Sequence, residues 1–376
     1  MSKDTQSGLS RRHLFTGTTA LVAATSLSAC GGDEEAPLII RPDGVPMSNF
    51  GKESTAEEVT AGLDLSGKTA VITGCNSGLG YETMRVLASR GAHVFGVARS
   101  MEKATDACNS VVGTTTPFSG DLEQFETMAV CADAIGATGA PIDMLILNAG
   151  VMALPELQQV NGIERHFVIN HLGHFILANR LMEQVKSAPQ GRFVTVGSQG
   201  YMWAPDTGIQ FDNLDGAWGE YVPNTAYGHS KLANGLFSLE LARRLGESTA
   251  TANVIHPGVI NTNLGRHYPS YIRIFANLFS WALPFFKTVE AGAATETYAA
   301  TAPGLSEISG FYFEDCNPVV AGQNMENAAM AERLWTVSEG LTQPYLVSSA
   351  SVVDTDISAP RTWAEPMPSG AVPFRK

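Results

Sequence analysis

Basic residues are scarce in this 376-residue chain, in which 24 Lys and Arg stand against 37 Asp and Glu, for a formal net charge of −13. Binding to phosphate backbones or anionic lipid surfaces needs clustered Lys and Arg, so we expect no nucleic-acid partner. Charged residues make up only 16% of the chain and hydrophobic residues 44%. This composition differs from that of a disordered chain and is sufficient for a large packed core.

Cysteine is also scarce, and its five positions lack the paired spacing of zinc ribbons and the density of a disulfide scaffold. The histidines at 171, 174, 229 and 256 lack Asp and Cys partners at ligand spacing. Histidines that flank strand ends are usually satisfied by hydrogen bonds, so we predict no metal site. The scattered cysteines are Cys30, Cys75, Cys108, Cys131 and Cys316.

Residues 1–30 have the layout of an export signal. The Arg11-Arg12 pair resembles the twin-arginine motif, whose pathway carries folded proteins. The apolar stretch 14–29 is shorter than the roughly 20 residues of a spanning helix, and residues 27–30 resemble a bacterial lipobox. We therefore expect an exported, periplasmic or cell-envelope lipoprotein of a bacterium, attached to the membrane only through a lipidated Cys30. The alternative is a cytoplasmic protein with a disordered basic tail.

The rest of the chain divides into three parts. Residues 31–62, rich in Gly, Pro, Asp and Glu, predict a tether and a loosely packed lead-in. Strand and helix patterns alternate over residues 63–342 without a boundary. This alternation predicts one α/β domain with a single doubly wound parallel sheet, Rossmann-like and flanked by helices. Residues 343–376, with many Pro and Ser, form a C-terminal extension.

A glycine-rich turn follows the apolar run 69–73 and precedes a helical stretch. In such a strand-turn-helix unit, free N–H groups at the helix start attract a pyrophosphate. A tight turn without a ligand has the same pattern, so the turn alone is weak evidence. The candidate cofactor residues in it are Gly74, Asn76, Ser77, Gly78, Leu79 and Gly80.

A second strand, 93–98, ends at Arg99, where NAD-selective proteins usually have an acidic residue. An arginine at this place can bind the 2′-phosphate of NADP, so NADP(H) is the preferred cofactor. If Arg99 is instead a solvated surface residue, NAD(H) is the alternative. Further candidates at strand ends are Asp121 and Leu122, where the acid reaches the adenine edge, and Asn148, Ala149 and Gly150 beside the cofactor.

Three residues carry the expected chemistry. Ser198 ends the β run 191–197, and Tyr227 and Lys231 are four positions apart, on one face of a helix. A free tyrosine has a pKa of about 10, and a nearby ammonium favours the phenolate. The tyrosine can then exchange a proton with an alcohol or carbonyl oxygen while a nicotinamide exchanges a hydride. Tyr-x-x-x-Lys alone is usually helix surface, but here it follows the other motifs in a compatible order.

Together these motifs resemble those of the short-chain dehydrogenase/reductase family, over roughly residues 63–342. The resemblance implies a catalytic tetrad in which Tyr227 is the acid/base, Lys231 lowers its pKa and holds the nicotinamide ribose, Ser198 orients the substrate and Asn170 supports a proton-relay water. It also implies that Tyr227 and Lys231 touch the cofactor. Further cofactor contacts are expected from Pro257, Gly258, Val259 and Thr262.

A narrower likeness is to the retinol dehydrogenases and WW-domain-containing oxidoreductases, carried by residues 170–175, 227–234, 256–259 and 309–313. Tyr227 follows Ser198 by 29 positions, a long spacing that this subgroup shares. The sequence departs from the subgroup in two ways. Gly197 stands where family members often have a serine just before the catalytic serine, and no WW domain precedes the fold.

The likeness implies a lipophilic alcohol and its aldehyde or ketone as substrate and product. The aromatic stretch after Gly258 either lines such a pocket or belongs to the core or a subunit contact. Trp203, Trp218 and Tyr221 are expected to close the other side. Two alternatives remain: an exported nucleotide-binding lipoprotein without turnover, and an enone or pigment double-bond reductase. A homo-oligomer is compatible with the family.

Overall fold

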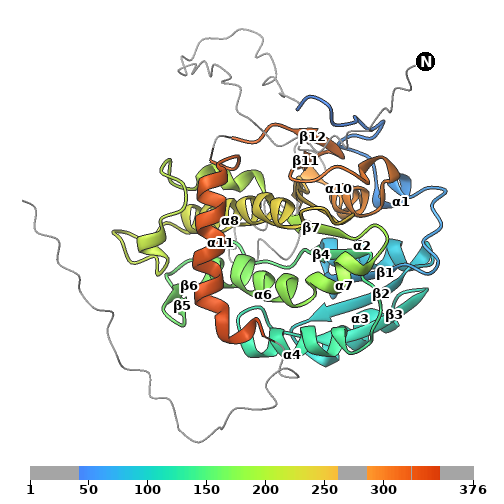
Figure 1. The fold of residues 1–376 in the computed structure, drawn as a ribbon, viewed down its shortest axis with the longest axis horizontal. Coiled ribbons are helices and arrows are strands. Elements are labelled where there is room, and N and C mark those ends of the chain that lie inside the picture. The colour runs from blue at the N-terminus through green and yellow to red at the C-terminus, as the bar shows by residue number, and fades with distance from the viewer. Residues whose placement is uncertain (1–41, 261–285, 323, 348–376) are drawn as a thin grey trace, which may run out of the picture. The chain divides into compact units, whose positions relative to one another are not determined.

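The computed structural model describes residues 42–260, 286–322 and 324–347. Its main sheet has eight strands in the order β12-β11-β8-β7-β4-β1-β2-β3, and neighbours are parallel except β11 and β12 (Figure 1). The strands are β1 (Thr69–Thr73), β2 (His93–Ala98), β3 (Thr114–Ser119), β4 (Met144–Leu147), β7 (Arg192–Val196), β8 (Thr251–His256), β11 (Tyr312–Glu314) and β12 (Asn317–Val319). The predicted fold class is confirmed, with an antiparallel edge strand that the sequence did not predict.

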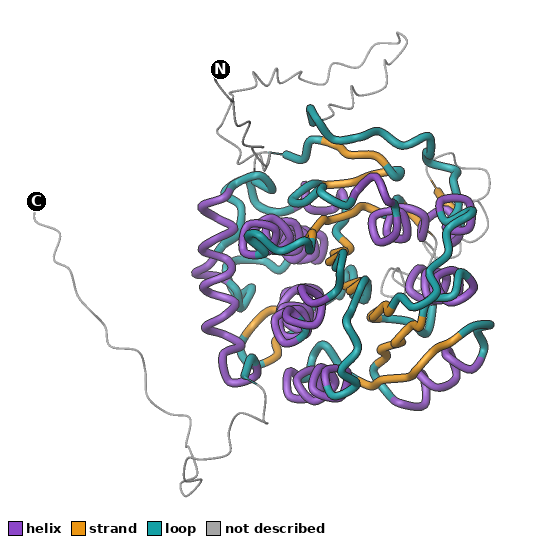
Figure 2. The backbone as a smooth tube through the Cα atoms, turned by 45° about the vertical axis from the view of Figure 1, so that its right-hand side comes forward, coloured by secondary structure: helices purple, strands orange, loops and turns teal. Residues whose placement is uncertain are grey.

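Helices cover both faces of the sheet (Figure 2). One face carries α2 (Gly78–Ser89), α3 (Met101–Asn109) and α10 (Val289–Thr301). The other carries α4 (Phe125–Gly136), α6 (Gly173–Arg180) and α8 (Pro223–Arg244), with α11 (Ala328–Thr342) packed on α8. The strand order reverses between β1 and β4. In doubly wound sheets, ligands bind in the crevice at the carboxyl ends of the strands, at this reversal.

Two apolar cores result from this layering, one on each face. In β1, Val71 packs into the core under α4, α6 and α8, whereas Ala70 and Ile72 pack into the core under α2, α3 and α10. Alternate residues of a strand point to opposite faces, so a sheet covered twice needs apolar residues throughout. All residues of β1, β4, β7 and β8 are accordingly buried.

Short elements connect these layers. Two small strand pairs, β5 (Gln159–Val160) with β6 (Ile163–Glu164) and β9 (Val259–Ile260) with β10 (Phe286–Lys287), lie outside the main sheet. A π-helical turn, η1 (Val168–Leu172), joins α5 (Arg165–Phe167) to α6. The remaining elements are α7 (Met182–Ser187), η2 (Gln199–Trp203), η3 (Phe211–Asn213), η6 (Pro303–Leu305) and η7 (Gln343–Tyr345).

The lead-in differs from its prediction. Residues 31–62 were expected to be loosely packed, but α1 (Ala56–Val59) packs against α10, with Ala56 and Val59 buried. Thr55 and Glu58 form a capping box, in which each side chain accepts a hydrogen bond from the backbone N–H of the other residue. A capping box is a sequence signal for the start of a helix. The prediction for this segment rested on its polar composition and did not use that signal. The predicted signal, the lipobox and residues 348–376 of the extension lie outside the described residues.

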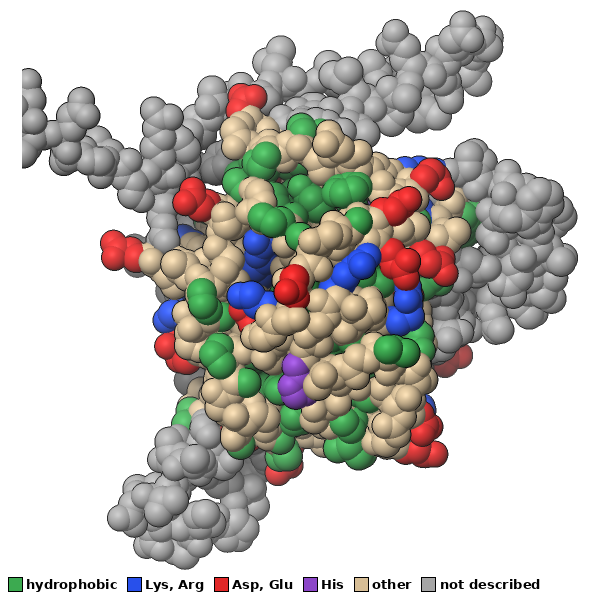
Figure 3. Space-filling view, turned by 90° about the vertical axis from the view of Figure 1, so that its right-hand side faces the viewer, with side chains coloured by type: hydrophobic (Ala, Val, Ile, Leu, Met, Phe, Trp, Pro, Cys, Tyr) green, Lys and Arg blue, Asp and Glu red, His purple; other side chains and the backbone are tan. Residues whose placement is uncertain are grey.

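Two surface properties bear on partners. In the part of the chain that the structure describes, no helix combines the length and apolar character needed to cross a membrane. On the face shown in Figure 3, basic side chains lie next to acidic ones. The absence of a nucleic-acid partner stays a prediction.

Candidate active site

The glycine turn lies at the carboxyl end of β1, where the predicted nucleotide contacts begin. Gly74 and Gly78 have positive φ angles of 74° and 57°, which glycine adopts without strain. A Cβ atom at Gly80 would collide with the Asn148 side chain and the carbonyl oxygen of Gly74, so only glycine allows this close packing. The turn residues and the end of β4 are therefore brought together as the sequence predicted.

The start of α2 has the properties of an anion site. Its N-cap, Ser77, makes no side-chain capping hydrogen bond, and the first turn has no acidic residue. Asn76 and Ser77 are exposed, and Leu79 is half-buried. Backbone N–H groups at such an uncapped start are available to a phosphate, and the helix dipole favours negative charge there.

Thr73, the last residue of β1, joins this turn to the end of β4. Its hydroxyl oxygen accepts hydrogen bonds from the backbone N–H groups of Asn148 and Ala149, both at 3.0 Å. The Asn148 side chain in turn donates to the Thr73 carbonyl oxygen at 2.8 Å. A Cβ atom at Gly150 would lie 3.0 Å from Asn170 Oδ1 and 3.8 Å from Lys231 Nζ. The strand end that is predicted to face the cofactor thus contacts two predicted catalytic residues.

Tyr227 and Lys231 lie on the same side of α8 and are both buried, 3% and 4% exposed. The Lys231 Nζ atom is 5.8 Å from the centroid of the Tyr227 ring and donates a hydrogen bond to the Val196 carbonyl oxygen at 2.8 Å. Burial lowers the pKa of Lys231 to about 7. The amine can therefore gain and lose a proton near neutral pH, beside the phenol.

Ser198 follows β7 directly and caps η2, where its hydroxyl oxygen accepts a hydrogen bond from Gly200 N–H at 3.0 Å. A Cβ atom at Gly200 would lie 2.7 Å from Tyr227 Cε1 and 3.1 Å from Ser198 Oγ. Gly200 thus separates the serine hydroxyl from the tyrosine ring, and any larger residue would push them apart. This requirement could not be predicted from the sequence, because it depends on how η2 packs on α8.

Asn170 lies in the π-helical turn η1, and its side chain is fully engaged. Oδ1 accepts a hydrogen bond from Val151 N–H at 2.8 Å. Nδ2 donates to the Val151 carbonyl oxygen at 3.0 Å and to Ser230 Oγ at 2.9 Å. π-helical turns are frequent at functional sites. The amide fixes the loop after β4 beside α8, and the support of a relay water by Asn170 stays a prediction.

The outer cofactor candidates lie directly after the carboxyl ends of β2, β3 and β8. Arg99 is exposed and has no hydrogen-bond or ion-pair partner among the described residues. The Asp121 carboxylate accepts a hydrogen bond from Glu123 N–H at 3.1 Å, and the Leu122 side chain is part of the core. Gly258 has a φ of 95°, and Val259 is 46% exposed. Pro257, which follows β8 directly in the chain, is buried. Thr262 lies outside the described residues.

The four histidines that invited a metal interpretation each have a hydrogen-bond partner. His171 Nε2 lies 2.7 Å from Ser338 Oγ, and His174 Nε2 lies 2.9 Å from Thr73 Oγ1. His229 and His256 accept hydrogen bonds from backbone N–H groups, those of Gln210 and Gln199. The described residues contain no group of three His, Cys, Asp or Glu side chains suited to a metal.

A polar cluster beside Tyr227 was not predicted. The Glu164 carboxylate accepts hydrogen bonds from His166 Nδ1 at 2.8 Å, from the Tyr221 hydroxyl at 3.1 Å and from Phe167 N–H at 3.0 Å. Desolvation by burial raises the pKa of Glu164, but His166 and the Phe167 N–H stabilise its charge more, so the pKa falls below its ordinary value. The His166 ring contacts the Tyr227 ring edge-on, with centroids 6.1 Å apart. The cluster therefore fixes the insertion before α8 against the catalytic helix.

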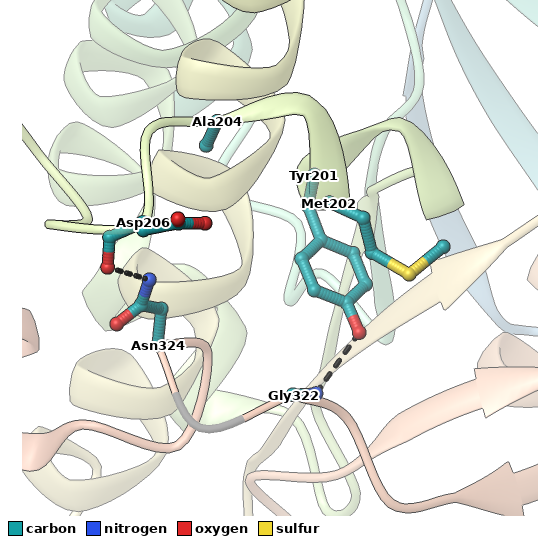
Figure 4. A pocket seen from close by; sticks show the side chains of 6 residues that line it. All are labelled: Tyr201, Met202, Ala204, Asp206, Gly322 and Asn324. Carbon is teal, nitrogen blue, oxygen red and sulfur yellow. Dashed lines mark hydrogen bonds between the residues drawn. The ribbon is translucent and has the colours of Figure 1, made fainter. Parts of the chain in front are cut away.

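The aromatic residues of that insertion have different positions. The Trp203 ring lies 6.2 Å from the Tyr227 ring and is 45% exposed, whereas Trp218 is 60% exposed. On the outer side of η2, Tyr201, Met202 and Asp206 line a hollow of about 200 Å³ with Gly322 and Asn324 (Figure 4). None of the predicted catalytic residues lines this hollow. We therefore assign the hollow no role in the predicted reaction.

Comparison with known proteins identifies the family to which the chain is similar. A family model described as short chain dehydrogenase matches residues 68–204. The chain is 38% identical to retinol dehydrogenase 12 of Mus musculus over 74% of this chain and 87% of that protein. It is 36% identical to the chloroplastic short-chain dehydrogenase TIC 32 A of Brassica napus, over 79% of this chain and 95% of that protein. The human WW domain-containing oxidoreductase is 33% identical, over 79% of this chain and 73% of that protein.

Solved structures show the same fold. An uncharacterised protein from Mycobacterium paratuberculosis has a TM-score of 0.62 and 30% identity, and the match covers 77% of this chain and 98% of that one. The RhlG/NADP active-site complex of Pseudomonas aeruginosa has a TM-score of 0.53 and 27% identity, over 67% of this chain and 95% of that one.

Proposed function

The chain belongs to the short-chain dehydrogenase family, and we propose that it is an NADP(H)-dependent oxidoreductase that interconverts a lipophilic alcohol and its aldehyde or ketone. The observation that carries the proposal is the placement of Tyr227, Lys231 and Ser198 around the carboxyl ends of β4 and β7. The likeness to retinol dehydrogenases supports the lipophilic substrate.

The residues at the crevice fit a dinucleotide. The uncapped start of α2 suits a pyrophosphate, and Gly80 keeps the turn close against β4. Exposed Arg99 at the end of β2 is suited to a 2′-phosphate. A bound nicotinamide dinucleotide supplies or accepts the hydride.

The chain's own residues handle the proton and the substrate oxygen. In the reductive direction the Tyr227 hydroxyl donates its proton to the carbonyl oxygen, which the Ser198 hydroxyl orients. Lys231, with its pKa lowered to about 7 by burial, replaces that proton on the phenolate at neutral pH. Trp203, close to the Tyr227 ring, provides apolar surface for the substrate.

Substitution of the tyrosine tests the reaction. Purified protein is incubated with NADPH and a panel of aldehydes, ketones and enones, and oxidation of the nicotinamide is followed by absorbance. We expect turnover of lipophilic carbonyl compounds, and Tyr227→Phe should lower kcat by about 10³-fold because the proton donor is lost. Unchanged turnover in the variant would exclude this mechanism. Turnover of enones alone would indicate a double-bond reductase, and nucleotide binding without any turnover would indicate a binding protein.

The preference for NADP(H) depends on Arg99 and has its own test. Replacement with Asp puts a like charge beside the 2′-phosphate and an acceptor beside the NAD ribose. We expect Arg99→Asp to weaken NADPH binding by about 10- to 100-fold. NADH binding should stay within about twofold, measured by nucleotide fluorescence. Equal losses for both nucleotides would contradict the assigned role.

Export is a separate part of the proposal. The Arg11-Arg12 pair and residues 27–30 support a twin-arginine lipoprotein signal. Folded export would let the protein carry its dinucleotide with it. Mass spectrometry of the membrane fraction should find a mature chain that begins at a lipidated Cys30, together with a co-purifying dinucleotide. A full-length chain in the cytoplasm would refute export.

A further inference from the structure

His174 connects the two halves of the candidate site. It lies on α6, 2% exposed, and each ring nitrogen has one partner. Nε2 is 2.9 Å from the Thr73 hydroxyl oxygen at the end of β1. Nδ1 is 3.0 Å from the backbone carbonyl oxygen of Asn170 in η1. A single buried side chain thus bridges the strand end that holds the glycine turn and the turn that holds Asn170.

The hydrogen bonds determine which nitrogen carries the proton. The Thr73 hydroxyl oxygen already accepts two hydrogen bonds, from the N–H groups of Asn148 and Ala149. Its own hydrogen is therefore free to be donated, and the His174 Nε2 atom is the acceptor within reach. Because Nε2 accepts, the neutral ring carries its hydrogen on Nδ1, which donates to the Asn170 carbonyl oxygen. Burial lowers the pKa of His174 to about 4, and the ring stays neutral at working pH.

The carbonyl of Asn170 matters because the amide of the same residue is engaged elsewhere, with Val151 and Ser230. The backbone oxygen of Asn170 accepts a hydrogen bond from His174 Nδ1, and a carbonyl oxygen can accept a second one. We take it as the atom of Asn170 that holds the relay water. The π-helical turn places this oxygen where the His174 side chain can reach it from the next helix. The position of the oxygen is thus linked, through His174 and Thr73, to the backbone of Asn148 and Ala149.

We propose that His174, in its Nδ1–H form, is a positioning residue that fixes the Asn170 carbonyl and couples it to the nucleotide side of the site. It touches neither substrate nor the reacting atoms. The inference rests on the proposed oxidoreductase function, but part of its test needs no turnover.

Three replacements separate the two hydrogen bonds. In His174→Asn the amide nitrogen takes the place of Nδ1 and keeps the bond to Asn170, and in His174→Gln the amide oxygen takes the place of Nε2 and keeps the bond to Thr73. His174→Phe fills the space and removes both. We expect the Gln and Phe variants to lose about 10-fold in kcat, with KM and NADPH affinity within about twofold, because only the proton path is disturbed. The Asn variant should keep most of the activity.

His171 supplies the matched control. It is 1% exposed, lies next to Asn170 in η1 and bonds to Ser338 on α11. His171→Phe should lower the melting temperature as much as His174→Phe and leave kcat unchanged. If His174→Phe also lowers only the melting temperature, His174 is structural and the proposal fails. The proposal fails equally if the Asn variant loses as much activity as the Gln variant, since the Asn170 bond would then be irrelevant.

Nitrogen NMR of histidine-labelled protein reads the tautomer directly. The wild-type spectrum should contain a neutral ring protonated on Nδ1 that disappears in His174→Gln and does not titrate between about pH 5 and 8. An Nε2–H ring at this position would overturn the inference whether or not the protein turns over a substrate. Absence of turnover with an Nδ1–H ring would instead count against the proposed function.

Discussion

Helices α8 and α10 are both buried along most of their length, and both contain buried ionisable side chains, among them Lys231 and Glu296. Lys231 of α8 is 4% exposed, and Glu296 of α10 is fully buried. Burial disfavours the charged form of each, so the pKa of Lys231 falls to about 7 and that of Glu296 rises to about 7. Judged by burial and proton affinity alone, the two helices are equivalent candidates for a catalytic element.

The positions of Lys231 and Glu296 in the fold distinguish the two helices. Lys231 lies beside the end of β7, where its amine donates to the Val196 carbonyl oxygen and approaches the Tyr227 ring. Glu296 faces α2, where Oε1 accepts a hydrogen bond from Thr83 and Oε2 has no partner among the described residues. A perturbed pKa therefore indicates a site only where a second reactive group and a strand end lie beside it.

Removal of the charge of Lys231 should produce the largest effect. Lys231→Met keeps the volume of the side chain but cannot exchange a proton with Tyr227. We expect kcat to fall by about 10²-fold. Glu296→Gln, measured beside it, should retain kcat within about twofold, because Glu296 lies away from the strand ends. If Glu296→Gln lowered kcat as much as Lys231→Met, the assignment of the catalytic role to α8 alone would be wrong.

The same lysine variant should be more stable than the wild type, and the gain should depend on pH. The folded pKa of Lys231 is about 7, below the ordinary value of 10.5. Below pH 7 the amine is charged in both states, so the folded state bears the full cost of burial. Between pH 7 and 10.5 the folded amine is neutral and the cost declines. We therefore expect Lys231→Met to raise the free energy of unfolding by about 5 kcal/mol below pH 7, with no gain near pH 10.5.

Loss of the lysine leaves no buried acceptor unpaired. The Asn234 side chain also donates to the Val196 carbonyl oxygen, at 3.2 Å. Urea unfolding at several pH values measures the difference. A variant less stable than the wild type at pH 6 would show that the buried amine stabilises the fold, in contradiction to its lowered pKa.

The residues of the candidate active site were largely predictable from the sequence. Tyr227 and Lys231 are four positions apart, and a helix brings such residues to one face whatever the surrounding structure. Ser198 and Asn148 follow apolar runs, and the carboxyl ends of parallel strands meet at one edge of the sheet. Local periodicity and the order of the motifs therefore predicted that these four residues gather at the site, whereas Asn170 was expected only from the family resemblance.

Contacts between distant segments could not be predicted in the same way. The bond from His174 to Thr73 joins positions 101 residues apart, and no local pattern pairs the two. Gly200 is required only because η2 packs on α8. The side chain of Asn170 holds Val151 and Ser230, which no local pattern indicates, and its expected support of a relay water stays a prediction. These pairings depend on how elements pack, which periodicity does not describe.

Glu296 gives the smallest effect and the opposite dependence on pH. Its folded pKa of about 7 exceeds the ordinary value of 4.5, so below pH 4.5 the carboxyl is neutral in both states and its replacement by a neutral amide changes little. Above pH 7 the wild type buries a charge, and Glu296→Gln does not. We expect the variant to gain about 3 kcal/mol in the free energy of unfolding at pH 8 and nothing at pH 4. Parallel pH profiles for the variant and the wild type would show that the pKa of Glu296 is the same in the folded and unfolded states, and α10 would then not hold a buried neutral acid.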